Sequence, residues 1–380
     1  PITNAALRIG TTGFGLIAVC YGFARFAFGL FLPEIDNELS LGPTLSGIIS
    51  GGSFFGYCIA IIASATLTER FGARAVAVCA SMVAAIGMAG IAAAPNAVWL
   101  AGAVLLAGSS TGLSSPPMAA AVTATVKRHQ QNITNTTINA GTSAGIALSG
   151  PIALLVAGQW RLAFGGFALV ALLMAFVARI TLPRTDDTPS SPQRLPPVTD
   201  DVVRLIIAAF LMGAASTALW SFGGQLANLH MGWKINDIGM LWVAIGSAGI
   251  FGAFAGAFVA RFGLNRTHWM FLGLMSVGIL AVGMTGATPF TTLLGGALFG
   301  ASYVMLTGVY LIWGVAASPN RPAMGLMIGF LMIAVGQTAG APVFGILMDA
   351  FGPDHAVMVF IVLGLAAGGA SIRRKLVAAR

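Results

Sequence analysis

The stretch ATLTERFGAR, residues 65–74, points to the fold because its central turn occurs twice in the chain. Arg70-Phe71-Gly72 returns 191 residues later as Arg261-Phe262-Gly263. The same spacing relates two further pairs, Gly145 with Gly336 and Pro151 with Pro342. In both copies of the turn the glycine permits a left-handed backbone at the end of a helix. Three matching features with the same offset indicate that the chain contains an internal duplication.

The apolar segments around this turn predict twelve membrane-spanning helices. Each is long enough to cross about 30 Å of hydrocarbon, where an α-helix satisfies its own backbone. The expected helices are 9–32, 45–68, 74–94, 97–125, 135–157, 160–182, 202–229, 238–261, 267–287, 290–317, 322–349 and 354–373. Glycines and prolines in 135–157 and 322–349 predict close helix packing and bending. The fold class is therefore all-α, with two pseudo-symmetric six-helix bundles.

A polar segment separates the two sets of six helices. Residues 183–201, PRTDDTPSSPQRLPPVTDD, contain five of the seventeen prolines and few apolar side chains. Such a segment cannot bury itself and is typical of a flexible connector. We expect an N-terminal bundle in 1–182, a cytoplasmic linker in 183–201 and a C-terminal bundle in 202–380. Paired repeats around a central pathway are typical of secondary carriers.

The composition excludes a soluble enzyme. The 380 residues are 57% apolar and only 8% charged, whereas an ordinary soluble domain has about 25% charged residues. A chain so poor in charge is stable only where most of its surface faces lipid. The odd number of cysteines, without metal-like spacing, predicts small buried side chains at Cys20, Cys58 and Cys79. The first helix is too long for a cleaved signal peptide and should remain as an anchor.

The net charge of +8 reflects topology rather than nucleic-acid binding. If residue 1 starts inside, sixteen basic residues lie at the cytoplasmic side and only Arg161 and Lys234 lie outside. This positive-inside bias predicts cytoplasmic termini and anionic lipid headgroups as partners. The expected location is a bacterial-type inner membrane. The sixteen are Arg8, Arg70, Arg74, Lys127, Arg128, Arg179, Arg184, Arg194, Arg204, Arg261, Arg266, Arg321, Arg373, Arg374, Lys375 and Arg380.

The opening stretch resembles the loop between the second and third helices of the major facilitator superfamily, Gly-x-Leu-x-Asp-Arg-x-Gly-Arg-Arg. The first half matches at Leu67, Arg70, Gly72 and Arg74, with Glu69 in place of the Asp, and departs at Ala65 and Ala73. The second half matches at Gly256, Arg261, Gly263 and Arg266, and departs at Ala260. Helix count, linker position and repeat extend the resemblance over the full chain. It implies a transporter that works by rocker-switch alternating access.

This loop is also a candidate conformational gate. Glu69 could pair with basic groups of the other bundle and latch the cytoplasmic side, whereas the alternative is that these charges only orient the loop. The candidate gate residues are Glu69, Arg70, Gly72, Arg74, Arg261, Gly263 and Arg266. Trp160-Arg161 resembles the family's outer Trp-Arg turn and is expected to be structural.

Arg25 is the one charge embedded in an expected helix, within Tyr21-Gly-Phe-Ala-Arg25. An arginine at a helix centre costs about 2.5–3.5 kcal/mol on insertion scales, so it should face an aqueous cavity or a partner. It could anchor an anion, because a guanidinium holds a carboxylate or phosphate through two parallel hydrogen bonds. The alternatives are snorkelling to the outer headgroups and a structural pairing with a backbone carbonyl.

The resemblance implies that helices one, four, seven and ten line the cavity, which gives Arg25 its candidate companions. Aromatic side chains with one polar tip suit small solutes. For each residue, helix packing or an interfacial aromatic belt is the alternative. The candidate substrate-binding residues are Arg25, Tyr21, Ser114, Trp220, Gln225, Asn228, Tyr303 and Tyr310.

No other ionisable group is expected inside the bundle. The eleven acids lie in loops or near helix ends, and so do His129, His230, His268 and His355. A built-in proton relay usually needs a carboxylate or imidazole inside the membrane. No nucleotide loop, metal cluster or nucleophile-base pair stands out, so we expect no cofactor, no metal and no enzyme activity.

We predict a transporter of a small, carboxylate-like organic anion, which is either secondary active, as an antiporter or symporter, or facilitative, as a uniporter. A monomer suffices, and its partners are the small-molecule substrate and lipid. One alternative is efflux of neutral or amphipathic compounds, with Arg25 in a structural role. The other is a membrane sensor that transports nothing.

Overall fold

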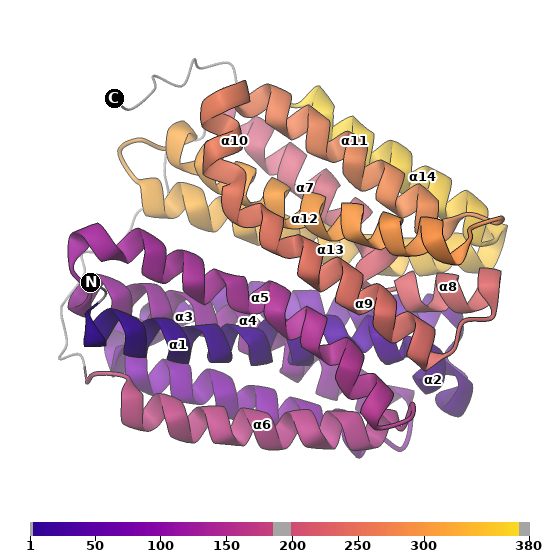
Figure 1. Cartoon of the computed structure of the whole chain (residues 1–380), viewed down its shortest axis with the longest axis horizontal. Coiled ribbons are helices and arrows are strands. Elements are labelled where there is room, and N and C mark those ends of the chain that lie inside the picture. The colour runs from indigo at the N-terminus through magenta and orange to yellow at the C-terminus, as the bar shows by residue number, and fades with distance from the viewer. Residues whose placement is uncertain (1–2, 185–198, 372–380) are drawn as a thin grey trace.

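The computed structural model describes residues 3–184 and 199–371, and the regular structure in these residues is helical. Figure 1 shows two groups of long helices stacked against each other, with α1 to α6 below and α7 to α14 above. Most of the expected linker, 183–201, lies outside the described residues.

The first group contains six segments of α-helix and one of π-helix. Two of its helices begin at side-chain caps, because Thr3 accepts from the backbone N–H of Ala6 and Asn96 from that of Trp99. The elements are α1 (Asn4–Ile17), the π-helix η1 (Ala18–Phe26), α2 (Ala27–Leu39), α3 (Gly42–Ala92), α4 (Ala97–Thr125), α5 (Arg128–Leu155) and α6 (Trp160–Thr181).

The second group begins at α7, whose N-terminus is capped by the Thr199 side chain. Its first elements are α7 (Asp200–Trp220), α8 (Gly223–Met231), α9 (Ile235–Gly249), the 3₁₀ helix η2 (Ile250–Phe254) and α10 (Ala255–Phe262). The others are α11 (Leu264–Gly283), α12 (Pro289–Ala317), α13 (Pro322–Phe351), α14 (Pro353–Ala366) and η3 (Ala367–Gly369).

Within the described residues, nine helices are long and apolar enough to cross a membrane. One of them, α3, has 51 residues and bends at Gly72, so the expected helices 45–68 and 74–94 are its two arms. With both arms counted and α11 and α14 added, the described residues give the twelve helices that the sequence predicts. Large apolar side chains such as Leu155, Leu169 and Phe176 lie exposed, which fits a lipid-facing surface.

The two copies of the opening turn have the same backbone. Gly72 has φ 79° and ψ 156°, and Gly263 has φ 83° and ψ 156°. Both values lie in a region that side chains other than glycine rarely adopt. The repeat therefore holds for conformation as well as sequence.

Glycines of α5 and α13 pack equivalent helices together in the two groups. A Cβ at Gly145 would overlap the Ala18 backbone of η1, and a Cβ at Gly336 would overlap the Phe210 carbonyl of α7. These two glycines are 191 residues apart. The close packing expected for these segments is confirmed, because only a hydrogen fits between the backbones.

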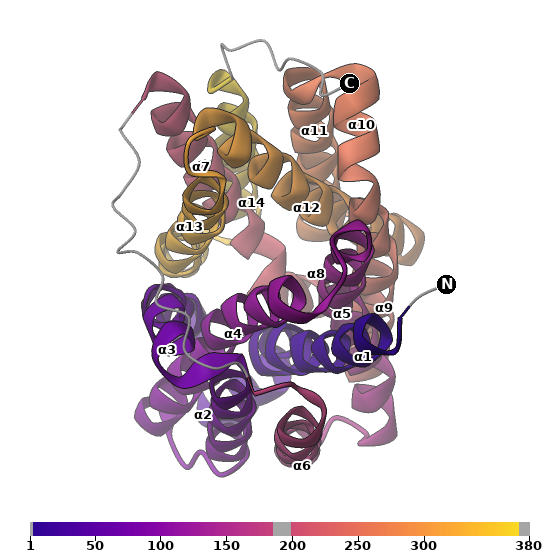
Figure 2. The ribbon, with the colours of Figure 1, turned by 90° about the vertical axis from the view of Figure 1, so that its left-hand side faces the viewer.

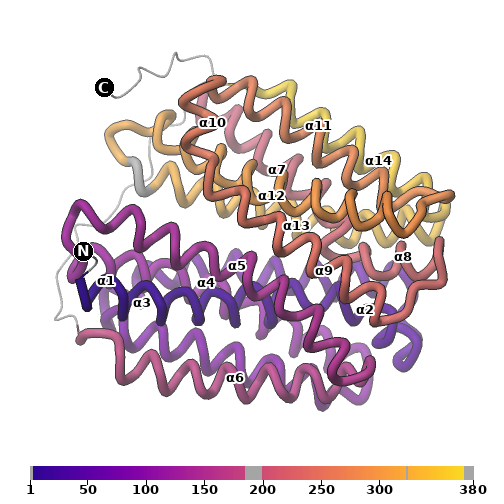
Figure 3. The backbone as a smooth tube through the Cα atoms, viewed as in Figure 1, coloured from indigo at the N-terminus to yellow at the C-terminus, as the bar shows by residue number. Residues whose placement is uncertain are grey.

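The two groups touch mainly at one end of the molecule. We call the end where α1 begins and α6 finishes the near end, and the end where α2 and α8 finish the far end (Figure 3). Figure 2 views the molecule from the near end, with the two groups one above the other. The hydrogen bonds between described residues of the two groups lie at mid-length or at the far end: Arg25–Gln337, Phe26–Trp242, Cys58–Thr338, Asp36–Gln225 and Thr44–Asp349.

Glycines allow this far-end contact. A Cβ at Gly29 of α2 would overlap the carbonyl of Trp220, and a Cβ at Gly47 of α3 would overlap that of Ala341. The backbones of the two groups therefore approach as closely as helices within one group.

Candidate functional site

The π-helix η1 places Arg25 between the two groups of helices. It widens the helical path over Ala18–Phe26, and Gly22 within it packs directly on the Gly145 backbone of α5. Single turns of π-helix often occur at functional sites, because they rotate a side chain away from the regular helical face. The Arg25 side chain is only 6% exposed. It therefore lies in the protein interior and does not reach the headgroup layer.

Arg25 is hydrogen-bonded to the opposite group through Gln337 of α13. Its Nη2 donates to Oε1 of Gln337 at 2.6 Å. The Gln337 Nε2 in turn donates to the Tyr303 hydroxyl at 3.1 Å and to the Ser216 hydroxyl at 3.2 Å. Gln337 is fully buried. A polar chain thus runs from η1 through α13 to α12 and α7.

Aromatic rings surround the guanidinium. Its central carbon lies 4.6 Å from the Tyr57 ring centre, 4.8 Å from Phe54, 5.1 Å from Phe26 and 5.8 Å from Tyr21. Each of these contacts is a cation–π interaction worth about 0.5–2 kcal/mol. The site is therefore a mostly apolar cage with one fixed positive charge.

No described carboxylate pairs with Arg25. The ion pairs among the described residues are Arg161–Glu38 and His230–Asp354. In addition, the Arg25 Nε is buried without a hydrogen-bond partner. Burying an ion costs several kcal/mol even after relaxation, and a hydrogen bond to a neutral amide does not neutralise it. The cage retains a full positive charge and a buried Nε donor without a partner.

The structure brings four of the eight candidate substrate-binding residues together. Arg25 and Tyr21 come from η1, Trp220 from α7 and Tyr303 from α12. The Trp220 ring lies 4.2 Å from Phe26 and 5.1 Å from Tyr303, and its Nε1 is buried without a partner. The Tyr21 hydroxyl is bonded to Ser115 of α4 at 3.0 Å.

Tyr310 lies apart from this cluster, inside the second group. Its hydroxyl is bonded to the His268 Nε2 at 2.9 Å and donates to the Ala208 carbonyl at 3.2 Å. His268 is fully buried, near the start of α11. The expectation that no ionisable group other than Arg25 lies inside the bundle is therefore wrong, because the His268 imidazole lies buried against the neutral Tyr310.

The other three candidates have structural partners elsewhere. The Gln225 side chain donates to Asp36 at the far end, and the Asn228 side chain donates to the Trp233 carbonyl in the loop after α8. The expected helix 202–229 breaks after Trp220, so both lie beyond the break. Ser114 is buried in α4 and donates to the carbonyl of Thr111.

The candidate gate residues lie on the near end and do not join the two groups. Glu69 and Arg70 are exposed, and Glu69 forms no ion pair among the described residues. The Arg74 side chain donates to the Leu182 carbonyl within the first group. In the second group Arg261 lies over its neighbour Phe262, and Arg266 is exposed, on either side of Gly263.

Sequence reasoning did not select Gln337, Phe54 and Tyr57. They lie on α3 and α13, outside the helices that the resemblance implied as cavity-lining. A lone glutamine in the apolar helix 322–349 was the available signal for Gln337, because a buried amide needs polar partners.

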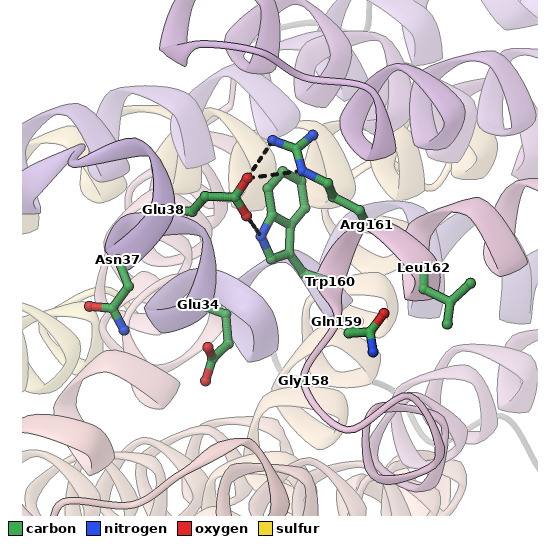
Figure 4. A pocket seen from close by; sticks show the side chains of 8 residues that line it. All are labelled: Glu34, Asn37, Glu38, Gly158, Gln159, Trp160, Arg161 and Leu162. Atoms are coloured by element: carbon green, nitrogen blue, oxygen red, sulfur yellow. Dashed lines mark hydrogen bonds and ion pairs between the residues drawn. The ribbon is translucent and has the colours of Figure 1, made fainter.

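A hollow of about 460 Å³ lies at the far end and is lined by α2, α6 and the loop between α5 and α6. Figure 4 shows Glu38 held there by Arg161 and Trp160. The contacts of Arg161 with Glu38 and the Ala92 carbonyl tie α2, α3 and α6 together. This agrees with the structural role expected for the Trp-Arg turn.

Comparison with known proteins identifies the fold. The model of the Major Facilitator Superfamily matches residues 14–336. Among solved structures, the D323A mutant of the nucleoside transporter NupG is 12% identical with a TM-score of 0.79, covering 97% of this chain and 98% of that one. No curated protein sequence matches significantly.

Two further structures extend the comparison. A bacterial homologue of the human lysosomal transporter Spinster, in an inward-facing and unoccupied conformation, is 13% identical with a TM-score of 0.77, over 97% and 96% of the two chains. The human organic anion transporter MFSD10 is 19% identical with a TM-score of 0.66, over 97% and 100%. The family resemblance and the fold class drawn from the sequence are thereby confirmed.

Proposed function

The chain belongs to the major facilitator superfamily, a family of multi-pass membrane transporters and not of enzymes, and we propose that its solute is a small, carboxylate-like organic anion that binds Arg25. Solutes named for the structural neighbours include nucleosides and organic anions. The fold alone therefore does not determine the substrate. The residues of the cage around Arg25 must determine it.

One observation carries the proposal: Arg25 is a buried cation between the two groups, with an unused Nε donor and no described carboxylate beside it. A guanidinium cannot lose its proton in a protein, so the charge persists in every state of the cycle. An organic carboxylate would supply the missing negative charge, and the rings of Trp220 and Tyr303 would cover its apolar part.

The position of the cage supports alternating access. Arg25 and Gln337 lie at mid-length, where one group meets the other. Since the hydrogen bonds between described residues of the groups continue to the far end, this conformation is closed there. The near end carries the basic loops and faces the cytoplasm of a bacterial-type inner membrane. Glu69 would pair across the groups only when the near end closes.

The competing candidate is efflux of neutral or amphipathic compounds. The bond from Arg25 to Gln337 favours it, because an arginine already held by the protein could be purely structural. Aromatic walls also suit neutral solutes. The two candidates differ in one respect: only the first requires a negative charge on the solute.

Counterflow in proteoliposomes tests this difference. Vesicles preloaded with benzoate or with its neutral analogue benzamide would be assayed for uptake of the same labelled compound. We expect benzoate exchange through the parent, and a loss of at least about tenfold in Arg25→Gln, because the ionic hydrogen bonds to the carboxylate are gone. Arg25→Lys should retain part of the activity, since it keeps the charge but not the bidentate geometry.

Arg161→Gln is the matched control, because Arg161 already has a carboxylate partner in the fold. It should exchange benzoate as the parent does. Equal benzoate exchange by the parent and Arg25→Gln would refute the anion proposal, and exchange of benzamide alone would establish the efflux candidate.

A further inference from the structure

The bond between Arg25 and Gln337 uses one of the two nitrogens on one edge of the guanidinium. Nε–H and one Nη2–H project from the same edge, which is the edge that binds both oxygens of a carboxylate side-on. Gln337 offers a single acceptor oxygen and takes Nη2 at 2.6 Å. The adjacent Nε is buried with no partner. This edge can therefore donate to two acceptor oxygens, but in this structure only its Nη2 has an acceptor.

Gln337 can release Arg25 and keep its other partners. Its amide nitrogen donates to Ser216 of α7 and Tyr303 of α12, and both belong to the same group of helices as α13. Loss of the contact to Arg25 would thus leave the amide anchored on its own side. A carboxylate in its place would make two hydrogen bonds to Arg25 where the amide makes one.

We propose that Gln337 is a specificity-determining competitor: its amide oxygen occupies the position of one oxygen of the transported carboxylate and must be displaced when the substrate binds. This inference rests on the proposed function. A neutral solute makes only a neutral hydrogen bond to Arg25 and gains less from displacing the amide than an ionised one does. Gln337 therefore weakens the binding of carboxylates, which must displace the amide, more than the binding of neutral analogues, which gain little from displacing it.

A purely structural bridge predicts the opposite result on removal. If Gln337 only holds the two groups together, its loss weakens binding of every solute. If it competes, its loss strengthens binding of a carboxylate, because the guanidinium edge is then unoccupied. The sign of the change in affinity separates the two roles.

The experiment compares Gln337→Met with the parent as purified full-length protein, by titration with benzoate and with benzamide. Methionine keeps the length and apolar volume of glutamine but offers no amide oxygen. The apparent Kd for benzoate should fall about tenfold, the equivalent of one charged hydrogen bond, and the Kd for benzamide should change less. The ratio of the two Kd values is a readout that a structural role would not shift.

Gln337→Glu provides the reverse test. A carboxylate at this position can fill both Nε and Nη2, so it acts as an internal substrate. Benzoate affinity should fall at least about tenfold and benzoate should no longer raise the unfolding temperature, because the edge is occupied. Thr338→Val is the matched control: Thr338 is the next residue on α13 and contacts Cys58 of the first group instead of Arg25.

The outcomes separate the two levels of the proposal. Arg25-dependent benzoate binding that is equal in the parent and Gln337→Met overturns the competitor role and leaves the proposed function standing. Weaker benzoate binding by Gln337→Met, with an unchanged ratio to benzamide, also overturns it in favour of a structural bridge. Absence of benzoate binding from the parent and from both Gln337 variants overturns the proposed function as well.

Discussion

Arg161 and Arg25 both lie against aromatic rings, but only Arg161 has a carboxylate partner among the described residues. Arg161 donates to Glu38 through Nε at 3.0 Å and Nη2 at 2.7 Å, and to the Ala92 carbonyl through Nη1 at 2.9 Å. Its side chain is 36% exposed. Arg25 is almost fully buried, and its hydrogen-bond partner in the described structure is one neutral amide.

The arginine with the higher desolvation cost is the one that lacks a carboxylate partner. Water would stabilise Arg161 with little help, yet the chain gives it a carboxylate, one oxygen of which accepts from both Nε and Nη2. The desolvation cost is largest at Arg25, where no described carboxylate is supplied. If Arg25 were purely structural, the buried arginine would be expected to have the carboxylate partner and the exposed arginine to need none. The difference is explained if the counter-ion of Arg25 arrives with the substrate.

The largest expected effect is a gain in stability from Arg25→Met. Replacing an unpaired buried ion with an apolar side chain of similar length should raise the free energy of unfolding by about 1–4 kcal/mol. The gain should lie at the lower end, because the four cation–π contacts are lost and the Gln337 oxygen loses its donor, while the amide nitrogen keeps Ser216 and Tyr303. The apparent unfolding midpoint, at one heating rate and without carboxylates, measures this. A midpoint below that of the parent would support a structural Arg25.

A smaller effect, of opposite sign, is expected from Arg161→Met. The variant loses the pair with Glu38, but both side chains are more than a third exposed, so solvent screens the interaction. The loss should be at most about 1 kcal/mol. The same midpoint measurement should therefore show a small decrease, with benzoate exchange retained. A decrease that matches or exceeds the change in Arg25→Met would remove the contrast between the two arginines.

The sequence could predict those features that depend on the chemistry of a single residue. Arg25 stands out because it is a charge inside an apolar helix, and Gly72 and Gly263 because only glycine adopts their backbone readily. These signals need no knowledge of tertiary packing. They indicate the family and identify Arg25, the donor of the hydrogen bond to Gln337 of the other group.

Tyr310 shows what packing adds. Tyr303 and Tyr310 are seven residues apart, so they share a face of α12, but seven residues rise about 10 Å along a helix. Tyr310 therefore lies two turns away from the Gln337 contact, where His268 of α11 and the backbone of α7 satisfy its hydroxyl. Helical periodicity gives the face of a helix but not the depth at which a partner helix crosses it.

For a related reason, the sequence marks Gln337 only as a lone amide in an apolar helix and does not assign its partner. Its position facing Arg25 depends on Gly336, which lets α13 lie directly on the backbone of α7. The neutral amide carries no charge signal of its own. Its importance appears only when the partner across the two groups is known.

The charge requirement of the cage is the central claim, and isothermal titration of the parent and Arg25→Gln with benzoate and benzamide tests it most directly. We predict that the parent binds benzoate at least about tenfold more tightly than benzamide, since a charge-assisted bidentate pair replaces a neutral contact. Arg25→Gln should bind the two compounds with similar, weaker affinity. Equal affinity of the parent for both compounds, or unchanged discrimination in Arg25→Gln, would contradict the account.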